Sequence, residues 1–316
     1  MNQNSFTIKL SAEQQKKLAA LLRAPRYTPV EVPYTQIAVD TGTCHVNLYN
    51  SGKCLVQGKG AEEWITFTLE PEVLGEARLG YDAVHDPESV EPHMGIDESG
   101  KGDFFGPLVI ASVYTDVKSV EILKELGARD SKKITSDRVA LQLASDIRKK
   151  LDGRYAVVAI GPESYNRMYT KIANVNRMLA WGHARAIENL LEKIPDCPRA
   201  LSDKFGSTTL IERALMEKGK KIKMDQRTKA ESDPAVAAAS ILARAGFLMA
   251  LRKMEKDFGI ETVPKGCSAK VKQIAAQLIA EKGPGILLKT CKCHFKTTDE
   301  VLGMNGYSRS DLPAAG

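Results

Sequence analysis

The residues best suited to chemistry are gathered at 95–107, where two adjacent acids precede a short glycine-rich loop. Asp97 and Glu98 form a costly pair, because two like charges a few ångströms apart repel each other. Divalent metal ions bound through oxygen are the usual partners of such a pair. The glycines of the 100–102 loop leave its backbone free to approach a ligand closely. This combination predicts a metal site beside a phosphate or sugar backbone, as in a nuclease.

Further acids fall where secondary-structure elements are expected to begin or end. Asp203 follows a short apolar segment, 199–202, and ligands of α/β sheets collect at the carboxyl ends of strands. Asp233 precedes Pro234 and suits a helix start, which explains it structurally but also directs its carboxylate outward from a rigid element. Glu231 has no such structural reason, although it could simply be exposed. Four converging carboxylates could hold two divalent ions for an in-line phosphoryl displacement, without a nucleophilic side chain.

Other reaction classes lack their sequence signals. The chain has neither a Gly-x-x-x-x-Gly-Lys-Ser/Thr phosphate loop nor a Gly-x-Ser-x-Gly nucleophile elbow. Its six cysteines are mostly scattered, which favours reduced thiols over a disulfide framework. The segment 291–294, Cys-Lys-Cys-His, resembles half of a zinc site. A second ligand pair at the usual spacing is missing, so we do not expect zinc.

The composition permits a nucleic-acid partner without requiring one. A net charge of +6 and a pI near 8.9 are mildly basic. No apolar run approaches the roughly 20 residues that span a bilayer, and the N-terminus lacks the pattern of a signal peptide. We therefore expect a monomeric cytoplasmic protein that does not bind membranes.

The N-terminal residues, 1–80, predict a small domain of their own. Ser11 is placed to cap a helix whose leucines recur at helical spacing. Strands are predicted on either side of this helix by alternating apolar residues, at 6–10, 37–40, 45–49 and 54–58. A second helix is predicted at 62–69. The pattern is that of an α+β domain.

A polar stretch with two prolines, 81–93, is the natural linker to a second domain at 94–316. Strands are predicted in this second domain at 94–97, 108–114, 155–160 and 199–202. Helices are predicted between and after them, at 136–151, 163–194 and 235–256. This alternation predicts an α/β domain with a central sheet and flanking helices.

The segment 97–107, DESGKGDFFGP, resembles the signature of the type 2 ribonucleases H, and most closely that of their ribonuclease HIII branch. Four further segments resemble family motifs in the same order: 130–133 (DSKK), 235–244 (AVAAASILAR), 264–266 (PKG) and 294–298 (HFKTT). The resemblance implies a ribonuclease H-like α/β domain with a central mixed sheet. It also implies a preceding α+β domain similar to the TATA-box-binding protein fold.

By this resemblance the chain is expected to be an endonuclease that hydrolyses the RNA strand of RNA–DNA hybrids. The resemblance implies two Mg²⁺ or Mn²⁺ ions, and products with 5′-phosphate and 3′-hydroxyl ends. Asp97, Glu98 and Asp203 would be catalytic metal ligands. The family places a fourth acid just before the alanine-rich helix. We expect Asp233 in that role because a helix start fixes its direction, with Glu231 as the alternative.

Substrate-binding residues are carried over by position in the same way: Ser99, Gly100, Lys101, Gly102, Ser131, Lys132, Lys133 and Ser240. The backbone of the 100–102 loop would contact ribose 2′-hydroxyls, which distinguish RNA from DNA. Basic residues of the first domain could grip the hybrid backbone: Lys9, Lys16, Lys17, Arg23 and Arg26. Two alternatives remain, namely ribonuclease HII-like cleavage at single ribonucleotides embedded in DNA and a non-catalytic hybrid-binding module. Clustered acids disfavour the second, because they would repel a phosphodiester.

Overall fold

The computed structural model describes residues 5–75, 89–128, 134, 136–203, 208–215, 217–227 and 230–314. The chain forms two compact units, 1–88 and 89–316, each of which is described by itself. Residues 81–88 of the expected linker lie outside the described part. Residues 89–93 belong to the second unit, so that unit begins earlier than the sequence pattern predicts.

The first unit is an antiparallel sheet with helices. Its sheet has the strand order β1-β5-β4-β3-β2. Along the chain its elements are β1 (Ser5–Lys9), α1 (Ala12–Leu22), β2 (Thr28–Pro29), β3 (Thr35–Asp40), β4 (His45–Tyr49), β5 (Lys53–Gln57), α2 (Ala61–Trp64) and the π-helix η1 (Ile65–Leu74). The helix predicted at 62–69 therefore continues to residue 74.

One face of this sheet is apolar and packs against the helices, and more and less exposed residues alternate along β1 and β5. Val46 and Leu48 of β4 are fully buried in a core that also contains Leu18 of α1. The α1 helix begins at Ser11, whose side chain forms a reciprocal capping box with Gln14. The residues of β1 and β5 on the other face include exposed lysines and polar side chains.

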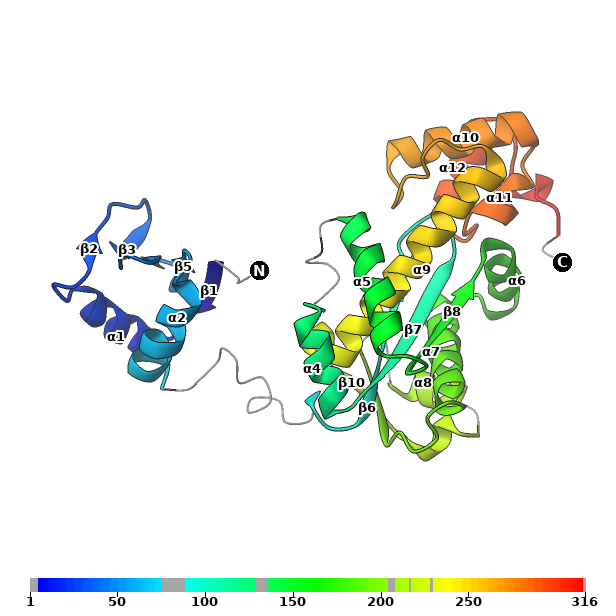
Figure 1. The fold of residues 1–316 in the computed structure, drawn as a ribbon. Coiled ribbons are helices and arrows are strands. Elements are labelled where there is room, and N and C mark those ends of the chain that lie inside the picture. Colours follow the sequence, from blue (N-terminus) through cyan, green and yellow to red (C-terminus); the bar gives the residue numbers. More distant parts are fainter. Residues whose placement is uncertain are drawn as a thin grey trace. The chain divides into compact units, whose positions relative to one another are not determined.

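The second unit has a mixed five-stranded sheet in the order β10-β9-β6-β7-β8 (Figure 1). β10, β9 and β6 run parallel, whereas β7 and β8 are antiparallel to their neighbours. The strands are β6 (His93–Ser99), β7 (Leu108–Thr115), β8 (Tyr155–Ile160), β9 (Arg199–Asp203) and β10 (Lys223–Arg227). This arrangement is the predicted α/β domain with a central mixed sheet.

Helices cover both faces of the sheet. One face carries α4 (Val117–Glu125), α5 (Asp137–Lys150) and the long α9 (Pro234–Phe258). The other carries α6 (Pro162–Ile172), α7 (Val175–Leu191) and α8 (Thr208–Ala214). The chain then continues through α10 (Ala269–Lys282), α11 (Ile286–Thr290) and α12 (Thr297–Gly303). Three short 3₁₀ turns lie elsewhere in this unit: η4 (Gly219–Lys221), η5 (Ala230–Ser232) and η6 (Arg309–Asp311).

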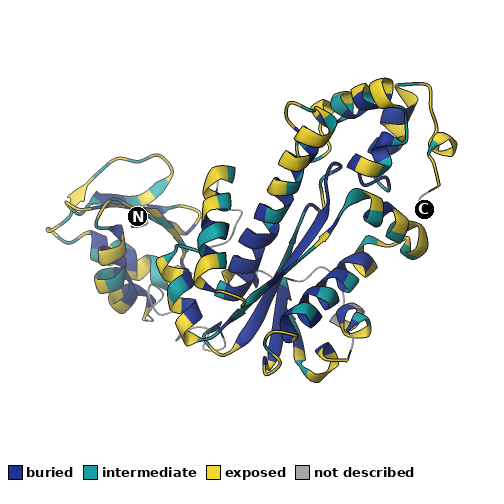
Figure 2. Cartoon of the chain, turned by 45° about the vertical axis from the view of Figure 1, so that its right-hand side comes forward, coloured by how far each residue is buried: buried dark blue, intermediate teal, exposed yellow. Residues whose placement is uncertain are grey.

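The core is centred on β6, β7 and α9, which Figure 2 shows as largely buried. On β7, Val109 and Ala111 face α9, whereas Ile110 faces α7. At Gly95 of β6, a Cβ atom would lie only 2.1 Å from the backbone nitrogen of Val236, so α9 crosses β6 in backbone contact. Among the described residues, α9 alone is long and apolar enough to cross a membrane, but 72% of that apolar window is buried inside the unit. It is a core helix.

The structure departs from the predicted elements in two main places. The helix predicted at 163–194 is divided into α6 and α7, because Ala173 adopts a left-handed conformation with φ of 49° and Asn174 caps the second helix. The lysine-rich segment 218–223 leads into β10, a strand that pairs with β9 and that is not among the predicted elements. A short edge strand of mostly polar residues has no alternating apolar pattern to predict it.

Candidate active site

Two of the predicted acids lie at the carboxyl ends of neighbouring parallel strands. The last paired residues of β6 and β9 are Ile96 and Ser202, so Asp97 and Asp203 follow directly, on strands about 4.8 Å apart. Both acids share the α9 face of the sheet, because Leu201, two residues before Asp203, packs against Val236 of α9. The structure therefore brings these two predicted ligands together.

Asp97 is held in place by α9 and by its own strand. The Ser240 hydroxyl donates a hydrogen bond to its carboxylate, and the Glu98 amide donates to Oδ1 at 2.8 Å. Burial and the adjacent Glu98 charge nevertheless raise the pKa of Asp97 to about 6. Ser240 itself is only 5% exposed. In this structure Ser240, expected as a substrate contact, orients Asp97.

Glu98 points to the opposite face of the sheet, as successive residues of a strand must. The Nε2 of His183, on α7, lies 3.0 Å from its Oε2. The ammonium of Lys101 lies 3.8 Å from its Oε1. His183 is fully buried, and sequence reasoning did not single it out. Its only signal was a histidine within an apolar stretch of the predicted helix, which more often marks a core position.

Asp233, the acid expected as fourth metal ligand, is engaged by other partners in this structure. Its side chain is fully buried, caps α9 through the amides of Ala235 and Val236, and lies 3.0 Å from His93 Nε2. His93 begins β6, about 13 Å from Asp97 at 3.3 Å per residue. Both carboxylate oxygens of Asp233 thus already face protein donors, with the Arg227 guanidinium 3.6 Å from Oδ2.

Glu231, the alternative fourth acid, lies in η5, and the preceding Ala230 packs against Leu201 of β9. This contact places Glu231 beside the strand that ends at Asp203. It is partly buried and has no hydrogen-bond or ion-pair partner within the described part of the chain. Such a carboxylate is available to a cation.

The donor set consists of carboxylate oxygens, which suit hard divalent cations such as Mg²⁺ and Mn²⁺. The raised pKa of Asp97 fits the same reading, because a bound cation would stabilise the two neighbouring charges that now repel. Among the described residues, no three Asp, Glu, His or Cys side chains are grouped closely enough to hold an ion. The acids line one edge of the sheet from β6, β9 and η5.

The 100–102 loop follows the acidic pair directly. Gly100 has φ of +87° and is tightly packed, since a Cβ there would lie 2.3 Å from the Pro107 carbonyl oxygen. Gly102 is the reverse, with open space where a Cβ would be. Lys101 between them is exposed, and Ser99 before them is partly buried at the end of β6. The loop is therefore tightly packed where it begins, at Gly100, and open to its surroundings at Gly102.

Ser131, Lys132 and Lys133, the predicted phosphate contacts, lie outside the described residues. Basic side chains are nevertheless placed at Ile134 and Asp137, which follow that segment in the chain. Arg244 of α9 donates to the carbonyl oxygen of Ile134 at 2.7 Å and to Asp137 at 2.8 Å. Lys265 donates to the other oxygen of Asp137 at 2.7 Å.

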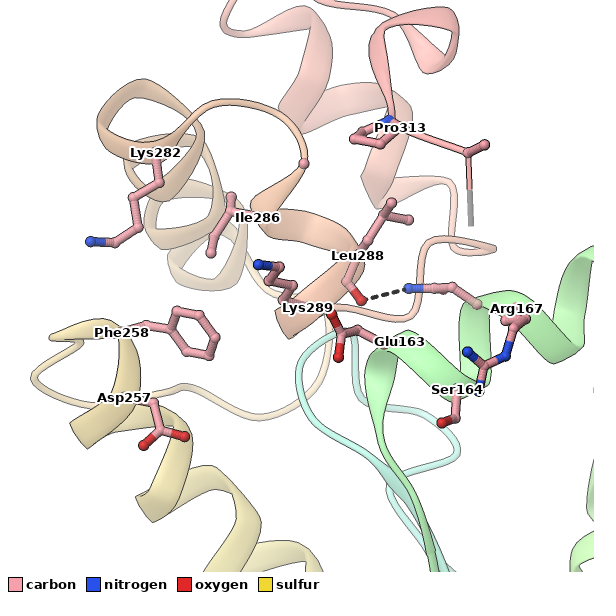
Figure 3. Close-up of a pocket in the computed structure, with 13 residues that line it drawn as sticks. Glu163, Ser164, Arg167, Asp257, Phe258, Lys282, Ile286, Leu288, Lys289 and Pro313 are labelled. Carbon is pink, nitrogen blue, oxygen red and sulfur yellow. Dashed lines mark hydrogen bonds between the residues drawn. The ribbon is translucent and has the colours of Figure 1, made fainter. Parts of the chain in front are cut away.

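A cavity of about 940 Å³ lies elsewhere, between α6, the end of α9 and α11 (Figure 3). Figure 3 shows Glu163, Phe258, Ile286 and Lys289 around it. None of the predicted site residues lines this cavity. Phe258 lies 18 residues beyond Ser240 on α9, about 27 Å at 1.5 Å per residue, so the cavity is separate from the acids.

Comparison with known proteins finds a matching family model for each of the two units. The family model described as Ribonuclease HII matches residues 94–298, and a domain of unknown function, DUF3378, matches residues 5–71. Ribonuclease HIII of Chlamydia muridarum is 41% identical over 273 residues, covering 86% of this chain and 88% of that protein. Ribonuclease HIII of Protochlamydia amoebophila is 38% identical over 301 residues, covering 95% and 98%.

Solved structures show the same likeness. Bst-RNase HIII in complex with Mn²⁺ superposes with a TM-score of 0.67 at 27% identity, covering 95% of this chain and 98% of that one. RNase H3 of Aquifex aeolicus superposes with a TM-score of 0.53 at 30% identity, covering 92% and 100%. Both likenesses extend over the N-terminal unit as well as the second unit.

Proposed function

The chain belongs to the ribonuclease HII family, the type 2 ribonucleases H, as an endoribonuclease of the ribonuclease HIII branch, and from this premise we propose that it hydrolyses the RNA strand of RNA–DNA hybrids with two divalent metal ions. The observation that supports this most is the position of Asp97 beside Asp203, at the carboxyl ends of parallel strands and on one sheet face. Cleavage by this route leaves 5′-phosphate and 3′-hydroxyl ends.

We assign four side chains to the metal ions, namely Asp97, Glu98, Asp203 and Glu231. These carboxylates would hold two Mg²⁺ or Mn²⁺ ions, which would supply charge stabilisation and water activation for an in-line phosphoryl displacement. Ser240 and His183 orient two of the ligands by hydrogen bonds from helices on opposite faces of the sheet. The Mn²⁺ complex of Bst-RNase HIII supports the choice of metal.

We propose that the backbone of the 100–102 loop contacts the ribose and so distinguishes RNA from DNA. Its position directly after the acids would place a ribose 2′-hydroxyl next to the scissile phosphate. The open space at Gly102 lets a sugar approach the backbone closely. Lys101, with the predicted phosphate contacts Ser131, Lys132 and Lys133, would offset the charge of the nucleic-acid backbone.

The N-terminal unit is proposed to grip the hybrid with the sheet face that its helices leave open. Lys9 and Lys53 are directly paired across β1 and β5, and both are exposed on that face. Two adjacent cations on an open sheet suit a phosphate backbone. This grip would raise affinity while leaving the chemical step to the second unit.

All four assigned acids come from one chain, so a monomer is sufficient for the proposed reaction. All six cysteines are free thiols, and five of them are buried. Free thiols accord with a reducing compartment. We therefore propose a monomer that acts in the cytoplasm.

The test is cleavage of three matched duplexes: an RNA–DNA hybrid, DNA with a single embedded ribonucleotide, and all-DNA. We expect cleavage of the hybrid that requires Mg²⁺ or Mn²⁺ and is lost in Asp97→Asn, while that variant still binds the hybrid. Asparagine is nearly isosteric and cannot become charged, so only the metal site is changed. Preference for the single ribonucleotide would instead indicate ribonuclease HII-like specificity. Binding of the hybrid without cleavage in any metal would indicate a non-catalytic module.

A further inference from the structure

Lys292 is a fully buried lysine outside the acidic site. Its ammonium donates to three successive carbonyl oxygens, those of Phe105, Gly106 and Pro107, at 3.2, 2.6 and 3.4 Å. It lies in the Cys-Lys-Cys-His segment, which the proposed reaction leaves without a role. The three carbonyls belong to the chain that leaves the 100–102 loop and enters β7.

The same ammonium contacts both surfaces that hold Gly100. A Cβ atom at Gly100 would lie 2.3 Å from the Pro107 oxygen and 2.8 Å from the Phe247 ring, so the glycine is wedged between them. Lys292 Nζ donates to that Pro107 oxygen and lies 6.0 Å from the centre of the Phe247 ring. Lys292 thus contacts both groups against which Gly100 packs, the Pro107 carbonyl and the Phe247 ring.

The lysine is itself held by main-chain contacts on both sides. The Lys292 amide donates to the Phe104 carbonyl at 2.8 Å, and the Gly106 amide donates to the Thr290 carbonyl at 2.9 Å. Asn166 of α6 donates to the Cys291 carbonyl at 2.9 Å and accepts from the Cys293 amide at 2.9 Å. The segment that carries Lys292 is therefore hydrogen-bonded to α6 and to residues 104–106, which follow the 100–102 loop.

Burying this charge is unfavourable for folding. Burial lowers the Lys292 pKa from 10.5 to about 8, although the nearby Asp103, Cys291 and Cys267 act in the opposite direction. A basic group whose pKa falls on folding destabilises the folded state at neutral pH. What the ammonium supplies is local order, because it donates hydrogen bonds to three successive carbonyls after the 100–102 loop.

We propose that Lys292 is a positioning residue for the 100–102 loop, holding it in the conformation that distinguishes RNA from DNA. This inference rests on the proposed function only for what the loop recognises. The order of the loop itself can be measured without cleavage. The expected consequence is selective, since losing the ammonium should weaken recognition of the hybrid more than recognition of an all-DNA duplex.

The first experiment compares Lys292→Met, which keeps the length of the side chain, with Leu190→Ala. Leu190 is buried in α7 on the opposite sheet face, so its variant reports general destabilisation. Well below the unfolding temperature, hydrogen exchange of peptides covering 99–107 should become faster in Lys292→Met only. Affinity for the hybrid in metal-free buffer should fall roughly tenfold to a hundredfold, with little change for all-DNA. Unchanged exchange at 99–107, or equal losses on both duplexes, would overturn the proposal.

The second experiment needs no variant, and so applies even where Lys292→Met fails to fold. As pH rises through about 8, Lys292 loses its proton, and the ratio of hybrid to all-DNA affinity of the unmodified protein should fall. The titratable groups around the ammonium are Asp103 at the loop, Cys267, Cys291 and His294 in neighbouring segments, and Tyr165 of α6. A ratio that stays constant from pH 7 to pH 9 in a protein that prefers the hybrid contradicts the proposal. A protein with no hybrid preference at any pH contradicts the proposed function instead, and the exchange measurement still decides the role of Lys292.

Discussion

The imidazole of His93 lies against the carboxylate of Asp233, with Nε2 at 3.0 Å from both oxygens and both side chains fully buried. The other ring nitrogen lies 2.7 Å from the Glu91 carbonyl oxygen. The imidazole therefore links the Asp233 carboxylate to the main chain of Glu91. The pair joins the first residue of β6 to the cap of α9. The pair therefore has a structural role, which favours Glu231 over Asp233 as the proposed fourth acid.

Asp233→Asn should destabilise the protein and leave its chemistry intact. Asparagine caps a helix as well as aspartate does. It removes the charge opposite His93, and breaking a buried ion pair costs about 3–5 kcal/mol. In a unit of this size that is a fall of roughly 10 °C in the unfolding temperature, measurable by calorimetry. The turnover number, measured well below that temperature, should be unchanged.

Glu231→Gln should show the opposite pattern. Its carboxylate has no partner among the described residues, so the unfolding temperature should be unchanged. Cleavage of the hybrid should be abolished, because one ligand oxygen becomes a neutral amide. If Glu231→Gln cleaves normally while folded Asp233→Asn does not, the assignment of the fourth acid is reversed.

His183 should control how tightly the site binds metal. Without it the Glu98 carboxylate loses the hydrogen bond that orients it, and outer-shell losses of this kind typically cost 10- to 100-fold in affinity or activity. His183→Ala should therefore weaken Mn²⁺ binding about 10- to 100-fold in a calorimetric titration. His183→Gln, which keeps an N–H donor, should recover part of that affinity. A wild-type affinity in His183→Ala would show that Glu98 needs no such partner.

His294 should make the protein less stable in weak acid. Burial, and then the charges of Lys292 and Arg309, lower its pKa from 6.5 to about 4. The unfolded chain therefore binds the proton more readily, and stability that is present above pH 6.5 is lost as pH falls toward 4. His294→Phe keeps the ring contacts with Tyr165 and Tyr169 and should flatten this loss.

The measurement for His294 is the free energy of unfolding in urea at pH 4.5 and pH 7.5. The exposed His45 of the first unit offers the matched control, since His45→Phe should leave the difference between the two pH values as it is. Equal acid losses in the protein and in His294→Phe would exclude His294 as the cause.

The open sheet face of the first unit should contribute to hybrid binding. Replacing both Lys9 and Lys53 with alanine should weaken binding and reduce the slope of log affinity against log salt by up to about 2, roughly one per lost phosphate contact. The turnover number at saturating hybrid should be unchanged. The control is Lys16 and Lys17 of α1, which are exposed and belong to the helical side of the unit. If replacing them has the larger effect, the helices rather than the sheet face the hybrid.

Local sequence was sufficient for much of the site. The strand before the acids, the glycine loop and the helix start at Asp233 each depend on neighbouring residues, through alternation, backbone freedom and capping. The pairing of Asp97 with Asp203 could also be anticipated, because parallel strands end at the same edge of a sheet.

Only the tertiary structure distinguishes the two candidates for the proposed fourth acid. Glu231 and Asp233 are two residues apart, and both lie where a fourth acid is expected. Their surroundings differ because the chain turns between them. The carboxylate of Asp233 is buried against His93, 140 residues away, whereas that of Glu231 has no partner among the described residues. The roles of His183 and Lys292 likewise depend on contacts 85 and 186 residues away along the chain. Periodicity along a chain reports which face a residue occupies. It holds no information on which distant side chain lies opposite, because that is set by how the packed elements cross.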